Sequence, residues 1–132
     1  MTAWTPDELL RVGDALELQI TSERADGTMR PYVTIWVVQV GDGLYVRSAH
    51  GVDNPWFRRA KASGAGRIRA GGLERDVTFV AAEGDVHEAI DAAYHVKYDP
   101  HEPEFVAPVV GAHAAPGTLR LQPRSRDTAA VL

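Results

Sequence analysis

The sequence contains no cysteine, which excludes disulfide bonds, thiolate nucleophiles and thiolate metal sites. Its longest apolar stretch, residues 33–38 with Thr34 inside it, is too short to span a bilayer. Residues 1–10 carry Asp7 and Glu8 in place of the apolar run of a signal peptide. We therefore expect a cytoplasmic protein with no membrane partner.

The common catalytic and nucleotide-binding motifs are also missing. No Gly-Lys-Ser/Thr triplet, HExxH or GxSxG motif occurs. Gly64-Ala65-Gly66 is followed by Arg69 where a dinucleotide fingerprint needs its third glycine, so we interpret these glycines as a turn. Hydrolase chemistry of the familiar kinds therefore has no support in the sequence.

Charge is distributed unevenly along the chain. The formal net charge is −4, which argues against general nucleic-acid binding, and we expect no nucleic-acid partner. Residues 47–75 nevertheless carry a net charge of +5, and the rest of the chain carries −9. This basic zone is either an anion site or a solvated face, and composition alone leaves both interpretations open.

Short alternating strands dominate the predicted structure. With 132 residues, 45% of them hydrophobic, the chain has the size of one ordinary domain, which we place at residues 1–124 with a flexible C-terminal tail at 125–132. Alternation of apolar and polar residues between turn signals predicts a mainly β protein. Six strands are expected, near residues 16–21, 32–40, 44–48, 67–70, 73–80 and 118–122.

The second predicted strand is apolar on both faces. Thr34, Trp36 and Val38 alternate with Val33, Ile35 and Val37 over residues 32–40. Such a strand is expected in the middle of a barrel or under a partner, not at an open edge. Its outer face predicts an association surface between two copies of the chain.

Three helices are predicted. The first begins at Pro6 and the second at Pro55, each after a capping residue, and a long helix covers residues 83–98 before the last strand. His87, Asp91 and His95 share one side of the long helix, which suits either a metal or, as we prefer, a solvated flank, so no metal site is predicted.

A strand ending in Arg47-Ser48 precedes the second helix, whose first turn holds Arg58 and Arg59. Guanidinium, hydroxyl and helix N-terminal N–H groups can all donate to one phosphate, so these residues can converge on an anion.

Longer runs of the sequence resemble a bacterial family known as domain of unknown function 2255. The runs are GTMRPYVTIWVVQV from residue 27, GDGLYVRSAHG from 41, PWFRRA from 55, GRIRAGGLERDVTF from 66 and IDAAYHVKY from 90. More distantly, Gly27 to Pro31 entering a strand, the strand ending near Ser48 and the Pro-Trp-Phe helix are similar to deazaflavin-dependent nitroreductases and flavin-binding split barrels.

This resemblance implies a six-stranded, FMN-binding-like split β-barrel and a homodimer. It implies FMN or deazaflavin as the cofactor and an oxidoreductase acting on a small organic substrate, in which the cofactor carries the hydride. The alternative is a non-enzymatic split-barrel module that binds haem or another anionic small molecule.

The same resemblance carries particular residues over to this chain. If the protein is such an oxidoreductase, Tyr94 or Tyr98 is a candidate proton donor, and no catalytic residue is assigned. The implied anion contacts and ring-side aromatics are Arg30, Trp36, Arg47, Ser48, Trp56, Arg58 and Arg59.

Overall fold

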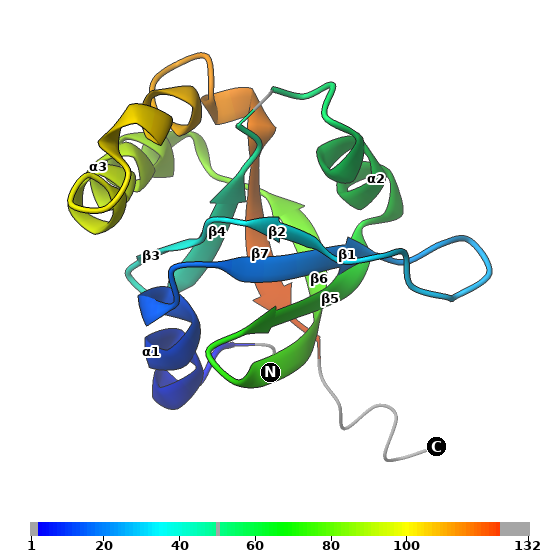
Figure 1. Ribbon diagram of the computed structural model, residues 1–132. Coiled ribbons are helices and arrows are strands. Elements are labelled where there is room, and N and C mark those ends of the chain that lie inside the picture. The colour runs from blue at the N-terminus through cyan, green and yellow to red at the C-terminus, as the bar shows by residue number, and fades with distance from the viewer. Residues whose placement is uncertain (1–2, 50, 125–132) are drawn as a thin grey trace.

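The computed structural model describes residues 3–49 and 51–124, so the predicted tail at 125–132 lies outside the described residues. Seven antiparallel strands form one sheet in the order β2-β1-β5-β6-β7-β4-β3 (Figure 1). The strands are β1 (Leu18–Ser22), β2 (Val33–Ile35), β3 (Val38–Val40), β4 (Gly43–Arg47), β5 (Ala65–Ala70), β6 (Leu73–Ala81) and β7 (Thr118–Pro123). The α-helices are α1 (Pro6–Asp14), α2 (Pro55–Ser63) and α3 (His87–Tyr98), and short 3-10 turns are η1 (Gly84–Val86), η2 (Pro103–Phe105), η3 (Ala107–Val109) and η4 (Ala115–Gly117).

The sheet curls into a half-barrel, which confirms the predicted mainly β, split-barrel class of fold. β2 and β3 are consecutive in the chain yet occupy opposite ends of the strand order, so the curl brings the two ends of the sheet toward each other. Figure 1 shows α1, α2 and α3 on different sides of this curled sheet.

The predicted strand at 32–40 is wrong in two respects. It is divided into β2 and β3, which raises the strand count from six to seven. Both pieces lie at an edge of the sheet, where the prediction excluded them, since β2 pairs with β1 alone and β3 with β4 alone.

Side chains of α3 hold the break between β2 and β3. The Trp36 ring stacks on the Tyr98 ring with centroids 3.9 Å apart. The backbone N–H of Val37 donates to the Tyr98 hydroxyl at 3.2 Å, and Lys97 Nζ donates to the Val37 carbonyl at 2.7 Å. Packing against α3 thus covers the break within the chain, whereas Val33 of β2 keeps an exposed fraction of 38%.

The core consists of two clusters of buried side chains. The larger cluster fills the inside of the curled sheet, where Val37, Leu44 and Ile68 are inaccessible to solvent. The second lies between α3 and β3–β4 and contains Val38, Tyr45 and Ile90. Val37 belongs to the inner cluster, so it is a core residue and not part of an association surface.

Helix starts follow local capping chemistry. Thr5 and Glu8 form a capping box at α1, and the Asn54 side chain accepts a hydrogen bond from the Trp56 N–H at the start of α2. α2 ends at Gly64, whose φ of 74° is the left-handed conformation that favours glycine. No helix within residues 3–49 and 51–124 is long and apolar enough to cross a membrane.

Candidate functional site

Three of the arginines predicted from the sequence border one cleft. Arg30, Arg58 and Arg59 line a hollow of about 860 Å³ between the end of β1, the 23–30 loop and α2. In Figure 1 this loop and α2 lie on the same side of the molecule. The structure therefore brings Arg30 to the same cleft as two residues that lie 28 and 29 positions later in the sequence.

Arg30 is held at the cleft through its backbone. Its N–H donates to the Ser22 carbonyl at 3.0 Å, and its carbonyl accepts a hydrogen bond from the Thr21 hydroxyl. Arg58 and Arg59 are exposed on α2, which is fixed by the Asn54 cap. The guanidinium groups of Arg30, Arg58 and Arg59 are therefore not needed to hold the backbone around the cleft.

The guanidinium groups of these three arginines have no hydrogen bond or ion pair with any residue of the described ranges. The other arginines of those ranges each have a side-chain hydrogen bond or an ion pair with the protein. One carboxylate, Glu23, also lines the cleft, and its partner is Arg124 at 3.3 Å. The cleft therefore has an uncompensated positive charge.

A small hollow, which we call the neck, shares lining residues both with this cleft and with an aromatic hollow. The neck, of about 20 Å³, shares Arg30 and Arg59 with the cleft and Val33 and Trp56 with the hollow. The hollow has a volume of about 590 Å³, and Trp36 is a further part of its wall. We refer to cleft, neck and hollow together as the trough.

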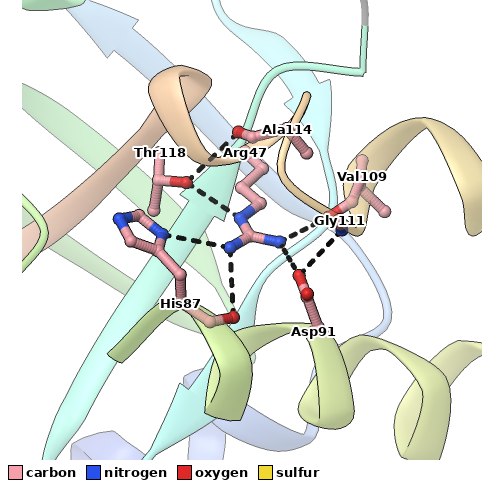
Figure 2. Close-up of polar contacts among 7 residues, drawn as sticks. All are labelled: Arg47, His87, Asp91, Val109, Gly111, Ala114 and Thr118. Atoms are coloured by element: carbon pink, nitrogen blue, oxygen red, sulfur yellow. Dashed lines mark hydrogen bonds and ion pairs between the residues drawn. The ribbon is translucent and has the colours of Figure 1, made fainter. Parts of the chain in front are cut away.

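Arg47 borders the aromatic hollow, but its guanidinium is fully buried and its donors are in use (Figure 2). Nε donates to Thr118 Oγ1 at 2.8 Å, and one terminal nitrogen donates to Asp91 and to the Val109 carbonyl. The other terminal nitrogen donates to His87 Nδ1 at 3.2 Å and to the His87 carbonyl at 3.3 Å. All five N–H groups have acceptors inside the protein, so we remove Arg47 from the candidate anion contacts.

Asp91 completes this network from α3. Burial alone would raise the pKa of its carboxyl, but hydrogen bonds from Arg47 and from the Gly111 N–H outweigh that effect and lower the pKa below its ordinary value. His95 instead pairs with Asp99 at 2.9 Å. Two of the three residues weighed as metal ligands, His87 and Asp91, thus contact the buried Arg47 guanidinium. No group of three or more His, Cys, Asp or Glu in the described part of the chain could hold a metal ion.

Ser48 does not line the trough. Its backbone N–H donates to the Gly117 carbonyl at 2.9 Å, beneath η4. Its hydroxyl is buried without a hydrogen-bond partner among the described residues. β4 is buried along its whole length, and this position follows directly after it, so the hydroxyl lies inside the protein.

The two tyrosines considered as proton donors are core residues. Tyr94 is completely buried, and burial raises the pKa of its hydroxyl. Burial also raises the pKa of Tyr98 to about 12, and its hydroxyl donates to the Leu16 carbonyl at 2.7 Å. Neither residue lines the trough, so the structure gives neither a position for proton transfer there.

Two features of the trough were absent from the sequence prediction. Arg24 lines the basic cleft, where its side chain donates to Thr28 and Met29 of its own loop. Phe105 lines the aromatic hollow from η2 and lies 72 positions after Val33, which lines the same hollow. No local pattern marks such a pairing, since it depends on the path of the connection between α3 and β7.

Several solved structures have a fold similar to that of this chain. A structure titled as an F420-H2 dependent reductase is 20% identical, covers 83% of this chain and 96% of its own, and has a TM-score of 0.60. A chain titled as a domain-swapped dimer is 18% identical, with coverages of 82% and 81% and a TM-score of 0.61. HutZ, titled as the heme storage protein from Vibrio cholerae, is 15% identical, with coverages of 95% and 92% and a TM-score of 0.58.

At these identities the three structures establish the split-barrel fold alone. No curated protein matches the sequence. Residues 8–121 match the family described as an uncharacterized protein conserved in bacteria, DUF2255, and this match includes α2, most of the sheet and the three arginines of the cleft. The chain therefore belongs to the DUF2255 family.

Proposed function

We propose that the trough binds a flavin or deazaflavin cofactor, with the phosphate-bearing tail in the basic cleft and the ring in the aromatic hollow. Arg30, Arg58 and Arg59 hold the tail, and Trp36 and Trp56 flank the ring. The protein would then be an oxidoreductase acting on a small organic substrate. The F420-H2 dependent reductase of similar fold supports this class of cofactor.

One observation carries the proposal: three guanidinium groups without a partner among the described residues line one end of a trough whose other end has indole walls. An anion in the cleft would accept charge-assisted hydrogen bonds that the protein does not provide. An aromatic ring in the hollow would pack against Trp36 and Trp56. A flavin-type cofactor has both parts in one molecule.

The residues of the trough suit binding and orientation more than proton transfer. A bound flavin or deazaflavin supplies hydride transfer. The arginines fix the tail by charge, and Trp36 and Trp56 orient the ring in the hollow. The absence of a recognisable triad from the sequence is consistent with this division of work.

We further propose a homodimer in which a second copy covers the aromatic hollow. The hollow is lined by Val33 and Phe105, whose exposed fractions are 38% and 56%. Exposed apolar side chains around a binding site are typical of a surface that a partner covers. The domain-swapped dimer of similar fold supports a two-chain assembly.

Titration of the purified protein with FMN and with a deazaflavin, followed by absorption and fluorescence, tests the function. We expect a saturable spectral change with at least one of the two and an increase in melting temperature at saturation. A protein that changes neither spectrum and shows no increase in melting temperature would refute the proposed cofactor.

A non-enzymatic module that binds haem is the second candidate, and the similarity to HutZ favours it. The described residues that line the trough include no histidine to serve as an axial ligand. The titration therefore includes haemin. A Soret shift with haemin, together with no response to FMN or deazaflavin, would select this candidate.

A further inference from the structure

A second hollow lies on the other side of α2 and shares no lining residue with the trough. It has a volume of about 410 Å³, within the range of small-molecule sites. Phe57 and Lys61, four positions apart on α2, face it, whereas Pro55, Arg58 and Ala62 face the basic cleft. One nine-residue helix thus separates two distinct hollows.

The walls of this hollow are mainly apolar. Phe57, Phe79 and Leu119 are buried members of the larger core cluster, and they form its floor. The remaining wall includes Ala82 and Pro116. A ligand body that fits these walls is apolar, because polar groups placed against them would lose hydrogen bonds to water.

His87 presents a hydrogen-bond donor at this hollow. Its Nδ1 lies 3.2 Å from a terminal nitrogen of Arg47. An arginine N–H can only donate, so Nδ1 accepts and the ring proton of the neutral imidazole is on Nε2. Figure 2 shows this second ring nitrogen directed away from Arg47, and it has no partner among the described residues.

Lys61 offers a second hydrogen-bond donor at this hollow. Lys61 is an exposed cation without a hydrogen bond or ion pair to any residue of the described ranges. Thr118 Oγ1 is already in use, since it accepts from Arg47 and donates to the Ala114 carbonyl. No carboxylate of the described residues lines the hollow. The available groups are therefore two donors, one of them charged, beside an apolar floor.

We propose that this hollow binds a small organic carboxylate with an apolar body. The carboxylate accepts hydrogen bonds from Lys61 Nζ and His87 Nε2, and the body packs on Phe57, Phe79 and Leu119. A phosphate fits less well, because it needs more donors than the hollow offers and has no apolar part. This site is independent of the cofactor proposed for the trough.

Phenylacetate is the probe for this site, and phenylacetamide, its uncharged analogue, is the control ligand. Binding is followed by two-dimensional NMR of the labelled protein, including the imidazole nitrogens of His87. We expect phenylacetate to shift the signals of Phe57, Phe79 and the His87 ring with a dissociation constant in the millimolar range, as for other ligands of this size. Phenylacetamide should bind at least about tenfold more weakly, because it lacks the charge.

Two variants remove one positive charge each. Lys61→Met should weaken phenylacetate binding about 10- to 100-fold, the effect of losing one charge-assisted hydrogen bond. Arg11→Met, on α1 and outside the hollow, should leave the affinity unchanged, and Lys61→Arg should restore most of it. Unaltered spectra with phenylacetate, equal affinity for acid and amide, or equal losses in Lys61→Met and Arg11→Met would each overturn the proposal.

Discussion

Arg47 shows how far one residue can differ from what its sequence position indicates. Its place at the end of a strand, in a basic stretch and before a helix, is typical of an anion contact. Whether such a guanidinium faces a ligand or the interior depends on acceptors far away in the chain. Here Asp91, the Val109 carbonyl and Thr118 lie 44, 62 and 71 positions later, and no local pattern links them to Arg47.

Arg47→Met should therefore lower the free energy of unfolding by about 3 kcal/mol or more, because it leaves buried acceptors without donors. Arg67→Met, which removes a half-exposed ion pair with Asp76, should cost less than about 1 kcal/mol. Urea unfolding of the two variants measures the difference. If Arg47→Met unfolds at the same urea concentration as Arg67→Met, the Arg47 network does not stabilise the fold as we predict.

The lowered pKa of Lys97 predicts that the stability of the protein depends on pH. Burial lowers the pKa of its ammonium group to about 8 from an ordinary value of 10.5, with Asp14 opposing the shift. Between these two values the unfolded chain binds more protons than the folded one, so the contribution of Lys97 to stability increases as the pH rises. Below that window the buried charge lowers the stability.

Comparison with Lys97→Met isolates this effect from the other titrating groups. The stability of the unmodified protein relative to the variant should be greater at about pH 10 than at about pH 7. Urea midpoints at both pH values provide the measurement. A relative stability that stays constant or falls with pH would contradict the lowered pKa.

At the scale of elements, α2 is well predicted because its signals are local. The Asn54 cap, Pro55 at the first position and Gly64 at the end lie within one segment of sequence. The break between β2 and β3 has no such signal, since residues 32–40 alternate like one strand. The break depends on Lys97 and Tyr98, which lie about 60 positions away.

Close contact between strands makes a sharp prediction for β5. A Cβ atom on Gly66 would lie 2.0 Å from the Thr21 carbonyl oxygen of β1, and backbone cannot move aside as a flexible side chain can. Gly66→Ala should therefore cost about 2 kcal/mol or more. Gly84→Ala is the matched control, since a Cβ atom on Gly84 would have no neighbour within 4 Å among the described residues. Similar unfolding midpoints for the two variants would disprove the close approach.

At the scale of the molecule, the sequence predicts the class of fold but not the arrangement of its strands. Alternation and turn residues indicate each strand separately. The order in which β1 lies beside β5 and β4 beside β7 comes from pairings between distant segments. The predicted site divides in the same way. Arg58 and Arg59 share a helix turn, whereas Arg30 reaches them only through the fold, and Arg47 and Ser48 are directed inward.

The proposed function requires Arg30, Arg58 and Arg59, which have no partner among the described residues, to bind the anionic tail of a cofactor. The most direct measurement is the dissociation constant for FMN and for a deazaflavin in the unmodified protein, Arg59→Gln and Arg120→Gln. Arg59 lines both the basic cleft and the neck, whereas Arg120 is paired with Asp42 and lines no part of the trough. We predict that Arg59→Gln weakens binding of the preferred cofactor about 10- to 100-fold and that Arg120→Gln leaves it unchanged. Equal dissociation constants in all three proteins would contradict the account.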